Sequence, residues 1–382
     1  MKIKRLSLKT TVQSIAVMLY FVLLVIHNLY HTILIDYLWC FILAVCFIFG
    51  AIKTTRFFSK NLALFVILFL LFSILNYIIV GNVSIDSIIF IVMYAGIYQL
   101  LIDDDLNDTY ILTAIYTNCI ILAFTIMRTG LGEPIFSNLS NNYVSVLLFL
   151  PTIVYYIRTE YYKNRITLMP TISVTIICIM AMGRGGIITA AFLTISILCY
   201  ILFSDNNRKS LYNQALIRIV FVFVGIIVLG VALSYSEKIK TIAVFERFVK
   251  FGMYGTGRAG IWKEYIKTAS TSLESILAGV EYSELPLMVR YKNNLHNSFF
   301  NLHADYGMIV LLYVIFLIIF NCKKCITNKK WIYLSVMTVF FARAFTDKIF
   351  GGGSMATPIF IFVLLHIRDK GFEEKLFHKR IF

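Results

Sequence analysis

Three residues in the second half of the chain have side chains that could carry out a group transfer: His296, Arg184 and Arg258. An imidazole can take up a proton near neutral pH and act as a general base. A guanidinium group binds phosphate oxygens in pairs and can stabilise the charge that develops on a leaving diphosphate. This combination favours cleavage of a diphosphate-linked donor by an attacking hydroxyl group. Because no acidic cluster lies with these residues, we expect the reaction to need no metal or other cofactor.

Each of these residues also has a simpler interpretation. Arg258 follows Gly257, and a glycine turn before a helix offers backbone N–H groups to an anion. The same pattern fits a capped interfacial helix whose arginine reaches toward lipid headgroups. Arg184, between Gly183 and Gly185, could do likewise, and His296 could be satisfied by its neighbours. A role in catalysis becomes the better interpretation because all three residues are predicted to lie on the same membrane face.

The elements that must position these residues are membrane spans. The chain has 382 residues, of which 59% are hydrophobic and 14% charged, whereas soluble proteins carry about 25% charged residues. A span needs about 20 mostly apolar residues. We therefore predict an all-α polytopic membrane protein, one transmembrane domain over 1–382, with twelve spans near 11–27, 32–51, 61–80, 84–102, 109–127, 143–157, 166–182, 186–203, 215–234, 298–320, 331–347 and 356–367.

Charge placement predicts the orientation of these spans. With the N-terminus in the cytoplasm, most lysines and arginines of the short connections fall on the cytoplasmic side, as the positive-inside pattern requires. The C-terminus is then cytoplasmic too. We interpret the net charge of +15 as an orientation signal and expect no nucleic-acid partner. The three residues named above all fall on the outer face.

One long connection, 235–297, is predicted to lie on the outer face between the ninth and tenth spans. We expect an amphipathic helix near 239–251 and a second helix from Arg258 to about Ala269, with Trp262 and Tyr265 as interfacial anchors. If the following span continues back to His296, the spacing places His296, His303 and Gly307 on one helical face.

Further residues near this outer face are weaker candidates for substrate binding. Arg343 and Asp347 are four residues apart and should pair at the end of the eleventh span. Lys348 follows them, and the glycines at 351–353 could line the same cavity. Cys322 and Cys325 form a CxxC, but no second ligand pair accompanies it, so we interpret them as unrelated thiols.

Four short motifs in the second half resemble those of the O-antigen ligase and O-antigen polymerase superfamily, which builds bacterial surface polysaccharides. They are Gly183-Arg184-Gly185-Gly186, Gly257-Arg258 with Trp262, Leu277-Ala278-Gly279-Val280, and His296-Asn297 followed by Gly307. Asp305 stands where the family often has an acidic residue. Val310 departs from the family, which often has a small residue at this point.

The resemblance implies an inverting, metal-independent glycosyl transfer from an undecaprenyl-diphosphate-linked oligosaccharide, at the outer face of the bacterial cytoplasmic membrane. His296 would be the general base, and Arg184 and Arg258 would contact the donor diphosphate. Asn297, Gly257, His303, Asp305, Arg343 and Lys348 are the further candidates for substrate binding. A chain-length regulator protein is a partner that the resemblance allows.

Two questions of function stay open at the level of sequence. A polymerase of O-antigen, capsular or extracellular polysaccharide would join lipid-linked repeat units, whereas a ligase would pass the glycan to lipid A-core. We favour a polymerase because no outer domain for docking lipid A-core is visible in the sequence. A transporter or flippase of the same lipid-linked sugars is the alternative of another class, and it would predict internal repeats and polar residues at mid-span.

Overall fold

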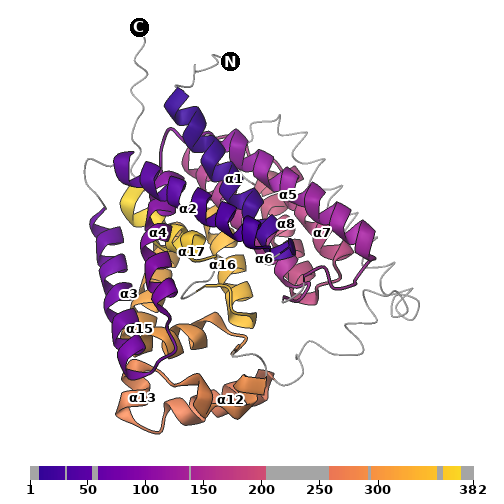
Figure 1. The fold of residues 1–382 in the computed structure, drawn as a ribbon. Helices are drawn as coiled ribbons and strands as arrows, with labels where there is room; N and C mark the ends of the chain where they lie inside the picture. Colours follow the sequence, from indigo (N-terminus) through magenta and orange to yellow (C-terminus); the bar gives the residue numbers. More distant parts are fainter. Residues whose placement is uncertain are drawn as a thin grey trace.

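The computed structural model of the chain describes residues 8–30, 32–53, 59–136, 139–203, 258–290, 294–350 and 356–370. Over these residues it is all-helical (Figure 1). The helices are α1 (Leu8–Tyr30), α2 (Ile33–Lys53), α3 (Lys60–Ile79), α4 (Ile85–Leu101), α5 (Asp108–Thr129), α6 (Tyr143–Tyr161), α7 (Met169–Met180), α8 (Arg184–Phe203), α12 (Arg258–Ala269), α13 (Leu273–Ala278), η1 (Tyr282–Glu284), α14 (Pro286–Arg290), α15 (Ser298–Thr327), α16 (Trp331–Thr346) and α17 (Thr357–Lys370).

The fold is that of a membrane protein with several spans. Among the described helices, six are long and apolar enough to cross a bilayer: Thr10–Tyr30, Ile33–Ala51, Lys60–Ile79, Asp108–Thr129, Arg184–Leu202 and Ser298–Thr327. Three further apolar helices are shorter, at Ile85–Leu101, Met169–Met180 and Trp331–Thr346. Each predicted span coincides with a helix except 215–234, which lies outside the described residues, as does the predicted interfacial helix near 239–251.

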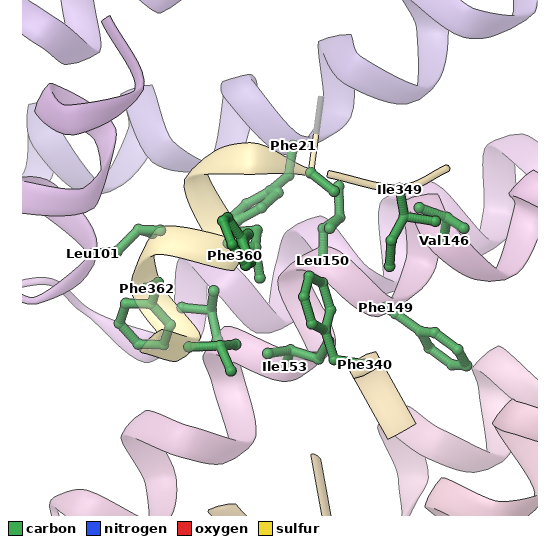
Figure 2. Close-up of a cluster of buried hydrophobic side chains, with 14 of the residues drawn as sticks. Phe21, Leu101, Val146, Phe149, Leu150, Ile153, Phe340, Ile349, Phe360 and Phe362 are labelled. Carbon is green, nitrogen blue, oxygen red and sulfur yellow. The ribbon is translucent and has the colours of Figure 1, made fainter. Parts of the chain in front are cut away.

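Two helices form the centre of the bundle. Both α6 and α17 are buried around almost their whole circumference, which requires a helix that is apolar on every face. Figure 2 shows how their side chains meet those of α1, α4 and α16. The ring of Phe350 stacks on Phe360 of α17 at a centroid distance of 4.1 Å. The segment that follows α16 is thereby fixed to the core.

A layer of short helices lies at the end of the bundle opposite the start of α1, as Figure 1 shows for α12 and α13. It has its own small apolar cluster, in which Ile261, Tyr265 and Leu295 are almost completely buried. The predicted helix Arg258–Ala269 is confirmed in its bounds. The prediction that Tyr265 anchors it at the membrane interface is wrong, because this side chain is only 2% exposed. Trp262 also turns inward, and its Nε1–H donates to the Leu295 carbonyl at 2.8 Å.

The long helix α15 is two helices joined at Gly307. This glycine has φ 76° and ψ −179°, a conformation that no helix contains. The half-helix before it, Ser298–Tyr306, packs on α13, and the part after it, Met308–Thr327, runs into the bundle. The prediction that His296, His303 and Gly307 share one helical face is therefore wrong: Asn297 caps the helix after His296, and Gly307 ends its first half.

Candidate functional site

His296 lies in the turn that leads into α15 and has a left-handed backbone, with φ 50°. Its backbone N–H donates to the side chain of Asn294 at 2.8 Å. Directly after it, the Asn297 side chain accepts from the N–H groups of Phe299 and Phe300, at 2.9 and 3.2 Å. Asn297 is thus an N-cap, a role typical of asparagine. The cap fixes the point from which the His296 side chain extends.

The partner of His296 is Asp347, at the end of α16. Its Oδ1 lies 3.5 Å from Nδ1 of the imidazole and accepts the backbone N–H of Lys348 at 3.0 Å. Its Oδ2 accepts from Nη2 of Arg343 at 3.1 Å, which confirms the predicted pairing of these two residues. Because Nδ1 faces the carboxylate, Nε2 lies on the opposite side of the ring, and the His296 side chain keeps 26% of its surface exposed.

The carboxyl group of Asp347 is ionised over the whole physiological range. Burial alone would raise its pKa, because the side chain is only 3% exposed. The contact with His296 at 3.5 Å and the positive charge of Arg343 outweigh burial and lower the pKa to about 2. A charged carboxylate that faces Nδ1 of an imidazole holds the ring in one orientation.

Ser298 ties the segment of Asp347 to the start of α15. Its hydroxyl donates to the Asp347 carbonyl at 2.7 Å and accepts the backbone N–H of Ile349 at 2.8 Å. Phe350 is stacked in the core. Together with this contact, the two hydrogen bonds of Ser298 leave His296 and Asp347 little freedom to move apart.

Arg343 connects this pair to the N-terminal end of α6. The side chain is 2% exposed, and besides Asp347 it donates to the Asn142 carbonyl at 3.2 Å and to Thr346 Oγ1 at 3.1 Å. The turn before α8 packs against the same end of α6. A methyl group at Gly183 would meet the Asn141 carbonyl oxygen at 2.8 Å, and one at Gly186 would meet Ser145 at 2.9 Å. Glycine at these positions therefore allows Arg184, the first residue of α8, to lie beside α6.

Arg258, the first residue of α12, approaches from the other side. Burial lowers the pKa of Arg258, Asp347 opposes this shift, and the positive charges of Arg343 and Arg184 add to it. Arg258 and Arg343 also act electrostatically on Tyr143, whose hydroxyl donates to the Lys348 carbonyl at 2.9 Å. The structure thus brings the three arginines of α8, α12 and α16 into one region with His296.

The charges of this region favour an anion. The three guanidinium groups named above carry three positive charges, and the carboxylate among them, Asp347, carries one negative charge. Arg158, at the other end of α6, shows how the chain satisfies a buried arginine elsewhere. It is 1% exposed, bonds Asp108 at 2.5 Å and donates to the carbonyls of Leu101, Asp103 and Leu106.

His303, a weaker candidate from the sequence, is engaged on both ring nitrogens. Nε2–H donates to the Ile276 carbonyl at 2.8 Å, so Nδ1 is the acceptor for the Tyr265 hydroxyl. The residue joins the half-helix of α15 to α12 and α13. These contacts favour a structural role over a contact with substrate.

Asp305 and Lys348 lie next to each other, with Lys348 Nζ 3.8 Å from Asp305 Oδ2. The other carboxylate oxygen accepts from the Tyr282 hydroxyl. No pattern in the sequence points to Tyr282, Tyr143 or Asn142 as part of the site, because their contacts join residues at least 23 positions apart in the chain. Gly257 and the glycines at 351–353 lie outside the described residues.

The motif Leu277-Ala278-Gly279-Val280 proves to be a packing element. A methyl group at Gly279 would meet the Ala304 carbonyl oxygen at 2.3 Å, and one at Gly307 would meet the Leu277 carbonyl oxygen at 1.9 Å. Both glycines have positive φ, so each serves as the close-contact point of a pair of backbones. Val310, where the sequence departs from the family pattern, is fully buried in the core.

Comparison with known proteins adds no further assignment to this geometry. Within the described residues, no three His, Cys, Asp or Glu side chains come together as metal ligands, and the expectation of a metal-independent reaction stays a prediction. No model of a known protein family, no curated protein and no solved structure matches the chain.

Proposed function

We propose that this chain is a membrane-embedded glycosyltransferase that joins oligosaccharide repeat units carried on undecaprenyl diphosphate. The observation that supports this most is the arrangement around Asp347. One carboxylate oxygen faces the imidazole of His296, the other pairs with Arg343, and Arg258 and Arg184 lie within electrostatic reach. A general base next to an excess of guanidinium charge suits a hydroxyl that attacks a diphosphate-linked sugar.

In the proposed reaction, Nε2 of His296 takes the proton of the acceptor hydroxyl. The acceptor oxygen forms a bond to the anomeric carbon of the donor, and the bond from that carbon to the diphosphate oxygen breaks. Its electron pair leaves with the diphosphate, whose charge is stabilised by Arg184 and Arg258. Asp347 holds the imidazole by Nδ1 and stabilises the imidazolium that forms. Attack from the face opposite the leaving group inverts the anomeric configuration.

We place the reaction at the outer face of the bacterial cytoplasmic membrane. The supporting arrangement has twelve spans and both termini in the cytoplasm, in keeping with the lysines and arginines of the short connections. The layer of α12 and α13 would then cover the site from outside. A chain-length regulator protein would be a further partner.

A polymerase fits better than the two alternatives. In the described residues, the outer layer is built of helices of at most twelve residues, a small surface for docking lipid A-core as a ligase must. A transporter would need polar groups along a path through the bundle. Instead the centre of the bundle, around α6 and α17, is packed with apolar side chains (Figure 2).

The first experiment is a reconstitution. Cells lacking this chain should accumulate single lipid-linked repeat units, which are extracted and incubated with the purified protein, with and without lipid A-core. A ladder of products from the repeat units alone would support a polymerase. Transfer only in the presence of lipid A-core would make the chain a ligase. Folded protein that gives neither product would contradict both the polymerase and the ligase activity.

The role of His296 is tested by two substitutions. Because its backbone is left-handed, His296→Ala combines loss of the imidazole with backbone strain, whereas asparagine tolerates this conformation. We expect His296→Asn to keep the wild-type unfolding temperature in detergent. Both variants should lower the rate of polymer formation by about 10²–10⁴-fold. Long polymer made at the normal rate by His296→Asn would exclude the general-base role.

A further inference from the structure

A second polar cluster lies beside the proposed catalytic residues and has no role in the mechanism above. Three elements form it: the half-helix of α15 provides Asp305, the segment after α16 provides Lys348, and η1 provides Tyr282. Asp305 is 4% exposed and accepts from the Tyr282 hydroxyl. The ammonium group of Lys348 lies 5.7 Å from the centre of the Tyr282 ring, and the lysine side chain is 29% exposed.

Lys348 and Asp305 are close enough to attract each other but too far apart to form a hydrogen bond. Nζ lies 3.8 Å from Oδ2, whereas a hydrogen bond between an ammonium and a carboxylate is about 2.7–2.9 Å long. The two charges attract each other without a direct hydrogen bond. A hydroxyl group can accept from the ammonium and donate to the carboxylate at the same time. Neighbouring hydroxyls of a sugar, whose ring stacks on an aromatic side chain, suit such a cluster.

Asp347 fixes this cluster relative to His296. The same carboxylate oxygen, Oδ1, faces the imidazole at 3.5 Å and accepts the backbone N–H of Lys348 at 3.0 Å. The other oxygen, Oδ2, pairs with Arg343 at 3.1 Å. Asp347 therefore connects Arg343, on one oxygen, with His296 and the backbone of Lys348, on the other, so the cluster of Lys348 and Asp305 begins next to His296 in the structure.

We propose that Lys348 and Asp305, with the Tyr282 ring beside them, form the subsite for the acceptor sugar and hold its attacking hydroxyl near His296. This assignment rests on the glycosyl transfer proposed above and deepens it. Lys348 and Asp305 hydrogen-bond to hydroxyls of the sugar. Tyr282 fixes the orientation of the Asp305 carboxylate and offers its ring to an apolar face of the sugar.

The test separates the two substrates. The repeat unit released from its diphosphate by mild acid can accept a sugar but cannot donate one. A lipid-linked unit whose terminal sugar hydroxyls are methylated can donate but cannot accept, and it serves as donor. Lys348→Met and Asp305→Asn should raise KM for the acceptor at least tenfold and leave KM for the donor within twofold of wild type. Lys263→Met makes the same change at an exposed lysine of α12 and should alter neither value.

Several outcomes would overturn the assignment. If Lys348→Met raises KM for the donor as much as for the acceptor, the lysine belongs to the diphosphate side. If neither value changes, the cluster binds no substrate. A wild-type protein without any transfer activity would instead contradict the proposed function. Should Asp305→Asn unfold, wild-type protein and Lys348→Met are compared on a set of monodeoxy acceptors that all keep the attacking hydroxyl. With wild-type protein, one of these acceptors should react at least tenfold more slowly than the complete acceptor. Lys348→Met should not slow the reaction of that acceptor further. Equal rates with every deoxy acceptor would overturn the subsite.

Discussion

At the scale of single residues, the carboxylate of Asp347 determines how the site responds to acid. Its pKa of about 2 lies below the value of about 3.9 for an unfolded aspartate. The folded protein therefore gains stability from this group above about pH 4 and loses it as the pH falls through 2. We expect the unfolding temperature of the wild type to drop between pH 4 and 2, and that of Asp347→Asn to change less. Equal acid sensitivity in both proteins would contradict this assignment.

The same substitution should separate the positioning of the base from binding of the donor. Asp347→Asn leaves the imidazole without a charged partner, so kcat should fall at least about 100-fold, while KM for the donor changes little. A loss that appears only in KM for the donor would place Asp347 among the binding residues instead.

Arg258 offers a second prediction at this scale. Lysine keeps the charge but cannot make two parallel hydrogen bonds to a phosphate. Arg258→Lys should therefore lower kcat/KM for the lipid-linked donor at least about tenfold. Arg128→Lys, the same change at an exposed arginine at the end of α5, should leave it unchanged. If lysine at position 258 supports normal kinetics, Arg258 provides only a general positive charge.

At the scale of elements, the break in α15 depends on Gly307. Any side chain there would need an unfavourable φ of 76° and would meet the Leu277 carbonyl oxygen at 1.9 Å. Gly307→Ala should thus destabilise the protein by roughly 3 kcal/mol or more. Gly81 has a similar φ of 80° with no atom within 4 Å of an added methyl, so Gly81→Ala should cost only about 1–2 kcal/mol. Equal losses in denaturation experiments would show that the contact with α13 contributes nothing.

The sequence predicted elements well where local chemistry determines them. The bounds of α12 follow from a glycine turn and a run of helix-forming residues, and the Arg343–Asp347 pair follows from helical spacing. The predictions from the sequence were wrong where a contact between distant segments overrides the local pattern. Tyr265 bonds His303, so a residue expected at the interface turns inward. The pairing of His296 with Asp347 joins residues 51 positions apart in the printed sequence, and no periodicity indicates it.

At the scale of the whole molecule, the orientation of the bundle is the main prediction. In a cysteine-free background, Lys263→Cys should react in intact cells with a maleimide that does not cross membranes, because α12 would be outside. Lys323→Cys, exposed near the end of α15, should react only after permeabilisation. The reverse pattern would invert the topology and place the candidate site on the cytoplasmic side.

The break at Gly307 also relates the site to the thickness of the bilayer. After it, the helix from Met308 to Thr327 has twenty residues, about 30 Å at 1.5 Å per residue, which is the thickness of a hydrocarbon core. A continuous helix would have to tilt or slide to place His296 at a given depth. The break instead lets the half-helix Ser298–Tyr306, and His296 before it, take a direction that differs from that of the span. In the function and orientation proposed above, hydrophobic matching of the span would set the depth of His296, so thicker or thinner lipids should change the rate of transfer with no change in the protein.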